Sequence, residues 1–340
     1  MKKVRFGVVG TNFITDWVIA GAREDSRFCL TAVYSRTRER GEEFATKYNI
    51  PHVFTSLEEM AASDEVDAIY IASPNALHSS QSILCMQYGK HVLCEKPMAS
   101  NAREARKMVA TARKQGVTLM EAMKSTLSPN FLAVKENIHR IGTPRRYFAS
   151  FCQYSSRYDK FKEGIVLNAF RPELSNGAMM DIGVYTIYPL VVLFGAPQSI
   201  NAQGIVLSSG VDGQGAVNMQ YDGINATILY SKIANSLLPA EIEGEDGNII
   251  IDRIQTPVDV RFHTRQAPAS GHEKRSEGEP LGHKDHHNEY YYEVKEFIDL
   301  IENGRTESDI NSHFASVTTL EIMDEVRRQL GVRYPADEEV

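Results

Sequence analysis

The segment Val4–Thr15, which reads VRFGVVGTNFIT, decides the fold that we expect for this chain. The apolar, β-branched run Val4–Val9 predicts a buried strand, Gly10 predicts a tight turn, and a helix is expected to begin near Phe13 or Ile14. A strand, a glycine turn and a helix in this order direct backbone N–H groups and the positive end of a helix dipole toward a pyrophosphate. The segment therefore predicts the first βα unit of a dinucleotide-binding domain.

The turn departs from the usual G-x-G-x-x-G pattern, because Asn12 and Thr15 stand where the second and third glycines would be. Asparagine tolerates a positive φ, so we expect Asn12 to replace the second glycine. Taken alone, this turn leaves an ordinary strand-to-helix connection open as the alternative. The candidate pyrophosphate contacts are Gly10, Thr11, Asn12, Phe13 and Ile14.

Short apolar runs continue to alternate with amphipathic segments as far as Glu121, which is typical of a parallel sheet covered by helices. We expect an α/β fold whose N-terminal domain, residues 1–122, is a doubly wound Rossmann sheet. The strands of this domain are expected at Val4–Val9, Cys29–Tyr34, His52–Phe54, Ala68–Ala72, His91–Cys94 and Thr118–Glu121.

Beyond residue 122 the pattern changes to period-two alternation, which predicts a large, mostly antiparallel sheet in a C-terminal α+β domain. We assign residues 123–310 to this substrate-binding and oligomerisation domain, and residues 311–340 to a C-terminal helix that packs back on the Rossmann domain. The short loops leave one sheet face open, which favours a homodimer or homotetramer. The strands are expected at Arg145–Tyr154, Ser199–Leu207, Ala216–Tyr221, Ala226–Ala234, Ala240–Glu243, Asn248–Asp252 and Val258–Thr264.

Composition points to a small-molecule partner. The formal net charge of -7 offers no basic surface for nucleic acid or an anionic membrane, and the apolar stretch Tyr188–Phe194 is too short to span a bilayer. The four cysteines are scattered and lack a paired spacing, so we expect reduced thiols in a cytoplasmic protein. A cluster of His283, Asp285, His286 and His287 lies in a polar loop and is expected to be solvated surface rather than a metal site.

The end of the second strand indicates which cofactor binds. NAD-specific sites usually place Asp or Glu there, whereas NADP needs cations and hydroxyls for its 2′-phosphate. This chain has no acid at that point and reads Ser35-Arg36-Thr37-Arg38. We therefore expect NADP(H) rather than NAD(H), with Ser35, Arg36 and Arg38 around the phosphate; a basic helix start on the surface is the alternative.

Three further segments carry a resemblance to a known family. Ser73-Pro74-Asn75 with His78, then Glu95-Lys96-Pro97, then Gly177–Tyr185 occur in this order along the chain. Together they resemble the glucose-fructose oxidoreductase / inositol dehydrogenase (Gfo/Idh/MocA) family of NAD(P)-dependent enzymes. Tyrosine at position 185 is similar to the dimeric dihydrodiol dehydrogenases and the NADP-dependent xylose dehydrogenases, because many other members have histidine there.

The resemblance implies a site and a reaction. It places Lys96 beside the nicotinamide, with a cis bond to Pro97, and makes Asp181 and Tyr185 catalytic residues. Tyr185, assisted by the Lys96 ammonium, is expected to exchange the hydroxyl proton while a hydride passes between NADP(H) and a sugar, polyol or cyclic diol. The alternative is a non-catalytic NADP(H)-binding redox sensor. The further cofactor contacts that the resemblance implies are Ser73, Pro74, Asn75, His78, Glu95, Lys96, Glu121, Asn168 and Arg171.

Overall fold

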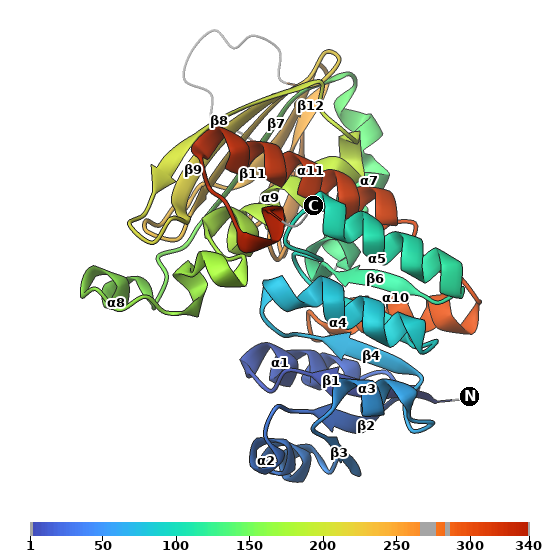
Figure 1. Cartoon of the computed structure of the whole chain (residues 1–340). Helices are drawn as coiled ribbons and strands as arrows, with labels where there is room; N and C mark the ends of the chain where they lie inside the picture. Colours follow the sequence, from blue (N-terminus) through green and yellow to red (C-terminus); the bar gives the residue numbers. More distant parts are fainter. Residues whose placement is uncertain (1–2, 266–276, 283–285, 339–340) are drawn as a thin grey trace, which may run out of the picture. The chain divides into compact units, whose positions relative to one another are not determined.

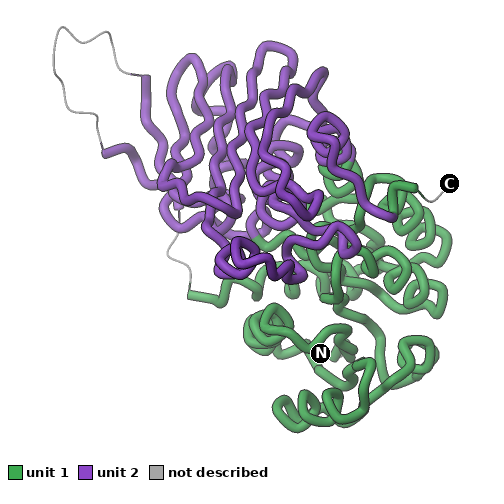
Figure 2. The backbone as a smooth tube through the Cα atoms, turned by 60° about the vertical axis from the view of Figure 1, so that its left-hand side comes forward, with its two compact units in different colours: residues 1–124, 286–320, 336–340 green, residues 125–285, 321–335 purple. Residues whose placement is uncertain are grey.

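A computed structural model describes residues 3–265, 277–282 and 286–338, and the chain divides into two compact units (Figures 1 and 2). Unit 1 comprises residues 1–124, 286–320 and 336–340, and unit 2 comprises residues 125–285 and 321–335. Residues 286–310 thus group with the N-terminal sheet, whereas the sequence assigned them to the second domain. The assignment of a function to each domain stays a prediction.

Unit 1 is built on a six-stranded parallel sheet in the order β3-β2-β1-β4-β5-β6, which confirms the predicted doubly wound fold. The order reverses between β1 and β4, so the loops that follow these two strands flank the switch point where such sheets bind ligands. The strands are β1 (Val4–Val9), β2 (Phe28–Tyr34), β3 (His52–Phe54), β4 (Ala68–Ile71), β5 (His91–Glu95) and β6 (Leu119–Ala122). The helices within the first 124 residues are α1 (Phe13–Ala22), α2 (Arg38–Tyr48), α3 (Leu57–Ala62), α4 (Asn75–Gln87) and α5 (Ala102–Gln115).

A returning segment completes unit 1 with helix α10 (Tyr291–Glu302), which packs against α1. A Cβ on Gly21 of α1 would lie 2.8 Å from the carbonyl carbon of Tyr290, so glycine is what permits this close approach. Arg27, which is largely buried, bridges Asp25 at 2.6 Å and Asp299 of α10 at 2.7 Å. These contacts explain why residues distant in sequence belong to the first unit.

Unit 2 contains an eight-stranded sheet in the order β14-β13-β12-β11-β7-β10-β9-β8. All of its pairs are antiparallel except β7 with β10, which confirms the predicted mostly antiparallel sheet. The strands are β7 (Pro144–Cys152), β8 (Ser199–Val206), β9 (Asp212–Gln220), β10 (Asn225–Ser231), β11 (Ala240–Gly244), β12 (Gly247–Ile251), β13 (Val260–Thr264) and β14 (Glu279–Pro280).

The helical segments that precede β8 are α6 (Lys124–Leu127), α7 (Pro129–Asn137), η1 (Ile138–Ile141), α8 (Tyr158–Lys162), η2 (Asn168–Phe170), η3 (Pro172–Leu174), the π-helix η4 (Met179–Gly183) and α9 (Val184–Phe194). Helix α11 (His313–Leu330) is shared, because its residues up to Leu320 group with unit 1 and those from Glu321 with unit 2. The short helix η5 (Pro335–Asp337) follows it.

The core of unit 2 forms where η4 and α9 pack on the sheet. The hydroxyl of the fully buried Tyr147 on β7 donates to the Thr186 carbonyl of α9 at 3.0 Å. The helical stretch Pro172–Phe194 is long and apolar enough to cross a membrane by length and composition, which the sequence analysis did not foresee, but 72% of its apolar window is buried inside the structure. This burial is what the core helix of a globular unit shows.

Candidate active site

The glycine turn after β1 is closed by backbone and side-chain contacts within unit 1. Gly10 has a φ of +103°, and a Cβ there would lie 2.5 Å from the Ala72 carbonyl oxygen. The Thr15 hydroxyl donates back to the Gly10 carbonyl at 2.9 Å, and Thr15 is fully buried. Only glycine fits at the first position, and Thr15 fills the third with a hydrogen bond that glycine could not make.

The expectation that Asn12 adopts a positive φ is wrong. Asn12 has a φ of -100° and a ψ of 179°, and its side-chain oxygen accepts from the Ile14 N–H at 2.9 Å as the N-cap of α1. The amide of Asn12 also donates to the Ala72 carbonyl at 3.3 Å. Asparagine is favoured here as a helix cap, which needs an extended backbone rather than a left-handed one. Helix α1 begins at Phe13, whose side chain is exposed.

Arg40 is a candidate cofactor residue that the sequence analysis missed. From the first turn of α2, its Nε donates to the Thr11 hydroxyl at 2.7 Å and its Nη2 to the Thr11 carbonyl at 3.2 Å. A guanidinium at the glycine turn fits an anionic ligand. A hollow of about 250 Å³ lies at this point, lined by Thr11, Asp16, Arg40, Glu43, Phe44 and Lys47.

The predicted phosphate-binding residues after β2 lie at different depths. Ser35 is buried, and its N–H donates to the Phe54 carbonyl at 3.0 Å. Arg36 is exposed, and Arg38 is exposed with an ion-pair distance of 3.7 Å to Glu42. The contact of these three residues with a 2′-phosphate stays a prediction.

His78 links the two loops that the family resemblance singled out in unit 1. Its Nδ1 lies 2.9 Å from the Pro97 carbonyl oxygen and its Nε2 2.8 Å from the Ser73 carbonyl oxygen, and the ring is buried. Burial lowers the pKa of His78, and a protonated ring nitrogen donates to the carbonyl that it faces. Helix α4 begins at Asn75 with Pro74 as its N-cap residue. His78 therefore positions these loops, and its direct contact with a cofactor stays a prediction.

Lys96 directly follows β5 and is the one residue between Val92 and Ala102 that is not buried. Its peptide bond to Pro97 is cis, as the family resemblance implied. The preceding carboxylate, Glu95, accepts from the buried Tyr70 hydroxyl at 2.5 Å and from the Lys96 N–H at 3.3 Å. Burial raises the pKa of Glu95. Lys96 is thus a partly exposed cationic residue at the edge of a packed layer of unit 1.

Glu121, predicted as a cofactor contact, lies inside unit 1 with 2% of its surface exposed. Its Oε1 accepts from the Met98 N–H at 2.9 Å, and its backbone carbonyl accepts from the Asn311 amide at 3.1 Å. Burial raises the pKa of Glu121 to about 7. In this structure Glu121 supports the turn that carries Lys96, and a contact with the cofactor stays a prediction.

Asp181 and Tyr185 are the two partly exposed residues in the otherwise buried run from Gly177 to Val191 of unit 2. Asp181 lies in the π-helix η4, and Tyr185 lies in the first turn of α9. The Tyr185 ring packs edge-on against Phe151 of β7, with a centroid distance of 5.7 Å. A π-helical turn changes which side chains share a face, and such turns are frequent at functional sites. One helical segment therefore presents a carboxylate and a phenol from an apolar core.

Lys232 is the second residue that the sequence analysis missed. Its Nζ lies 2.5 Å from Asp181 Oδ2 and 5.2 Å from the centre of the Phe170 ring. The ion pair joins Lys232 to Asp181 from a separate element, so no local pattern in the sequence predicts it. Asn168 and Arg171 flank Phe170 and are exposed, and the Nε of Arg171 donates to the Val166 carbonyl at 3.2 Å.

The predicted histidine cluster is only partly within the described residues. His283 and Asp285 lie outside them. His287 pairs with Glu24 through Nδ1 at 2.7 Å and stacks on Tyr291 with a centroid distance of 4.0 Å. These contacts attach the beginning of the returning segment to the end of α1.

Two family models match this chain. That of the Gfo/Idh/MocA oxidoreductase family with an NAD-binding Rossmann fold matches residues 4–123, and that of the Gfo/Idh/MocA C-terminal domain matches residues 131–250. The chain belongs to the Gfo/Idh/MocA oxidoreductase family. The resemblance seen in the sequence is thereby confirmed, and this member is an NAD(P)-dependent oxidoreductase.

Named members of the Gfo/Idh/MocA family are similar to the chain along its length. Scyllo-inositol 2-dehydrogenase (NADP(+)) IolU of Bacillus subtilis (strain 168) is 53% identical over 335 residues, which cover 98% of this chain and 99% of that protein. Trans-1,2-dihydrobenzene-1,2-diol dehydrogenase of Mus musculus is 32% identical, with 98% and 99% covered. The structure of aldose-aldose oxidoreductase from Caulobacter crescentus shares the fold at a TM-score of 0.82 and 20% identity, with 96% and 97% covered.

Proposed function

We propose that the protein is an NADP(H)-dependent dehydrogenase that transfers a hydride between the cofactor and a CH–OH carbon of a polyol, sugar or cyclic diol. The observation that carries the proposal is the set of Lys96, Asp181 and Tyr185, each a partly exposed polar residue in a buried run. The 53% identity to an NADP-dependent scyllo-inositol 2-dehydrogenase and the 32% identity to a dihydrodiol dehydrogenase favour a cyclic polyol or diol.

The residues of unit 1 fit NADP(H). Gly10 lets the turn after β1 lie close against the Ala72 carbonyl, and α1 directs its N-terminus at the same turn. Arg40, Ser35, Arg36 and Arg38 supply cations and a hydroxyl where an NAD-specific site would have an acid. When bound, the nicotinamide supplies hydride acceptance or donation.

The side chains of this chain supply the proton chemistry. In oxidation, the Tyr185 phenolate accepts the proton of the substrate hydroxyl, and in reduction the Tyr185 phenol returns it. A phenol ionises only well above neutral pH in water, so this role requires a cation that favours the phenolate, and the family resemblance implies Lys96 for it. Asp181 accepts hydrogen bonds from a neighbouring substrate hydroxyl and orients the ring.

Turnover of a substrate panel tests the proposal. Scyllo-inositol, an aldose and a trans-dihydrodiol are offered with NADP⁺ or NAD⁺, and formation of the reduced cofactor is followed by its absorbance. We expect turnover of at least one cyclic polyol or diol with NADP⁺, and a loss of about 100-fold or more in kcat for Tyr185→Phe with NADPH affinity retained. A fully active Tyr185→Phe enzyme contradicts the role of Tyr185. NADPH binding without turnover on any member of the panel favours the redox-sensor alternative.

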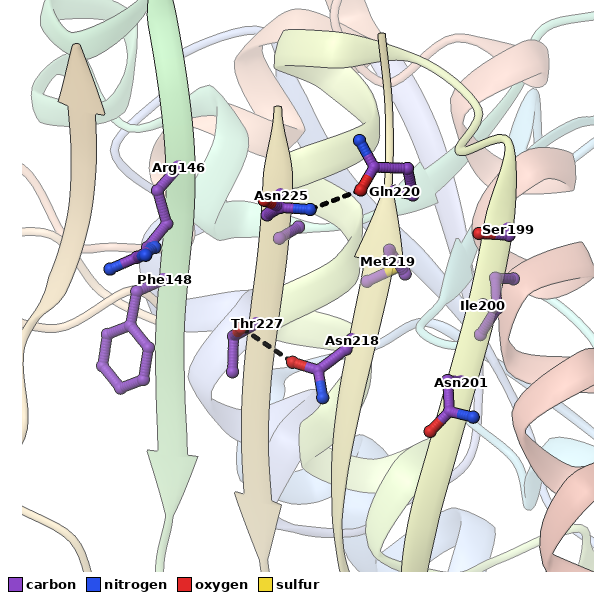
Figure 3. A pocket seen from close by; sticks show the side chains of 11 residues that line it. Arg146, Phe148, Ser199, Ile200, Asn201, Asn218, Met219, Gln220, Asn225 and Thr227 are labelled. Carbon is purple, nitrogen blue, oxygen red and sulfur yellow. Dashed lines mark hydrogen bonds between the residues drawn. The ribbon is translucent and has the colours of Figure 1, made fainter. Parts of the chain in front are cut away.

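We also propose that the molecule is a cytoplasmic homo-oligomer that associates through the open face of the unit 2 sheet. This face carries a shallow depression of about 810 Å³ between β7 and β8 (Figure 3). Its residues are mostly polar and already paired in part, since the Thr227 hydroxyl donates to Asn218 at 2.8 Å and the Asn225 amide donates to Gln220. Light scattering coupled to size exclusion measures the oligomeric state, and a monomer at micromolar concentration contradicts this proposal.

A further inference from the structure

A buried lysine of unit 2 forms an ion pair with the proposed catalytic carboxylate. The Lys232 side chain is 4% exposed and contacts Asp181 Oδ2 at 2.5 Å, whereas the Asp181 side chain is 40% exposed. A lysine ammonium is almost never buried unless it is paired, because it loses its hydration. Lys232 therefore needs Asp181, while Asp181 still presents part of its carboxylate to solvent.

The backbone around Lys232 is held on both sides. The Lys232 N–H donates to the Gly213 carbonyl at 2.8 Å, and the Lys232 carbonyl accepts from the Ser155 N–H at 2.8 Å. The Lys232 ammonium also lies over the Phe170 ring at 5.2 Å. A cation over an aromatic face gains attraction without adding a competing acceptor. The backbone hydrogen bonds of Lys232, the contact of its ammonium with the Phe170 ring and the opposite charge of Asp181 together direct the ammonium at Asp181.

The dipeptide Asp212-Gly213 is hydrogen-bonded both to Lys232 and to the π-helix that contains Asp181. Asp212, the residue before Gly213, accepts from the Met179 N–H at the start of the π-helix at 2.6 Å and is fully buried. A Cβ on Gly177 would lie 2.2 Å from Asp212 Oδ1, so glycine is needed for this approach. Asp181 and Lys232 are therefore attached to one anchor, and their relative position is set by backbone rather than by flexible side chains alone.

We propose that Lys232 is a positioning residue that keeps Asp181 an ionised acceptor directed at a substrate hydroxyl adjacent to the reacting carbon, so that the enzyme selects vicinal polyols and diols. The inference rests on the proposed function and names the substrate feature that the site recognises. An ionised carboxylate accepts hydrogen bonds and donates none, so it favours binding of a substrate that has a hydroxyl next to the reacting carbon. Asp181 and Tyr185 lie about one helical turn apart, which lets them address adjacent oxygens of one ring.

A double-mutant cycle tests the proposal with the full-length enzyme. Lys232→Met, Asp181→Asn and the double variant are assayed on scyllo-inositol and on cyclohexanol, a ring alcohol without a vicinal hydroxyl. We expect Lys232→Met to lower kcat/KM for scyllo-inositol by roughly 10-fold to 100-fold, mainly by raising KM, because Asp181 then loses its charge-assisted hydrogen bond to the vicinal hydroxyl. We expect little change in kcat/KM for cyclohexanol, which has no such hydroxyl. The double variant is expected to lose no more than Asp181→Asn alone, because Lys232 acts through Asp181.

Two further variants separate positioning from folding. Lys232→Arg keeps the charge and is expected to restore most of the activity on scyllo-inositol. Lys162→Met is the matched control, because Lys162 also pairs with an aspartate, Asp159, at 2.7 Å and lies near the Tyr154 ring at 5.4 Å, but it is exposed. We expect wild-type kinetics for this control.

Each outcome has one meaning. Additive losses in the double variant, or equal losses on both alcohols, overturn the role of Lys232. If Lys232→Met does not fold, Asp181→Asn is compared with the double variant, which removes both partners of the ion pair, and a lower kcat/KM in the double variant overturns the role as well. A wild-type enzyme that turns over no member of the substrate panel overturns the proposed function itself, and the inference with it.

Discussion

The Tyr70 hydroxyl donates to Glu95 at 2.5 Å, and both residues are buried directly behind Lys96. We expect Tyr70→Phe to lower the free energy of unfolding by about 1–3 kcal/mol, because Oε1 of the buried Glu95 carboxylate loses the hydroxyl that donates to it. Tyr88→Phe is the matched control, since Tyr88 donates to Glu58 at 2.6 Å but is 41% exposed. Urea unfolding measures both changes, and equal effects would show that burial does not strengthen the Tyr70 contact.

The buried Glu121 makes stability depend on pH. Burial raises the pKa of Glu121 from 4.5 to about 7, so the folded state holds this proton more tightly than the unfolded state does. The free energy of unfolding is therefore highest at pH values below 4.5, the pKa of Glu121 in the unfolded chain. It falls as the pH rises toward about 7, the pKa of Glu121 in the folded protein. Since one pKa unit corresponds to about 1.4 kcal/mol, the loss across this interval is about 3 kcal/mol.

Glu121→Gln removes the titrating group and keeps an oxygen for the Met98 N–H. We expect the difference in unfolding free energy between the two proteins to change by about 3 kcal/mol across that interval, in favour of the variant at the higher pH. Glu163→Gln, an exposed substitution, should follow the wild-type curve. Unfolding in urea at several pH values measures the curves, and parallel curves for Glu121→Gln and wild type would rule out a raised pKa.

Arg40 is expected to contribute to the choice of cofactor. Arg40→Gln should raise the KM for NADP⁺ by roughly 10-fold to 100-fold and change that for NAD⁺ much less, because a charge-assisted contact with phosphate is lost. Arg113→Gln is the control, since Arg113 is exposed and lies 3.5 Å from Glu307. Steady-state kinetics with both cofactors decide the outcome. An equal rise for both would assign Arg40 to the pyrophosphate instead of the 2′-phosphate.

Gly10 is expected to tolerate no side chain. Gly10→Ala would place a Cβ 2.5 Å from the Ala72 carbonyl oxygen at a φ of +103°, whereas Gly89→Ala, at a φ of +74°, meets nothing within 4 Å. The second substitution should cost about 1–2 kcal/mol through its backbone conformation alone, and the first at least about 2 kcal/mol more. Thermal unfolding compares them, with NADPH fluorescence as the measure of binding. Equal costs would mean that the turn can shift.

The sequence by itself determined the fold class and most of the candidate site. Strand periodicity, the turn at Gly10 and the residues Lys96, Asp181 and Tyr185 are local features, because each depends on neighbours within a few positions. The predicted strands agree with the observed ones to within a few residues for the same reason. The function of Asn12 was misjudged, because helix capping and a positive φ both favour asparagine and only the backbone angles distinguish them.

The tertiary structure alone decided which distant side chains meet. Arg40 reaches Thr11 across 29 positions, and Lys232 reaches Asp181 across 51, because strand order and register bring their elements together. The burial that raises the pKa of Glu121, and the return of residues 286–320 to unit 1, likewise depend on packing between segments far apart in the chain. A side-chain contact of this kind is a property of three-dimensional arrangement, and no single stretch of the sequence contains it.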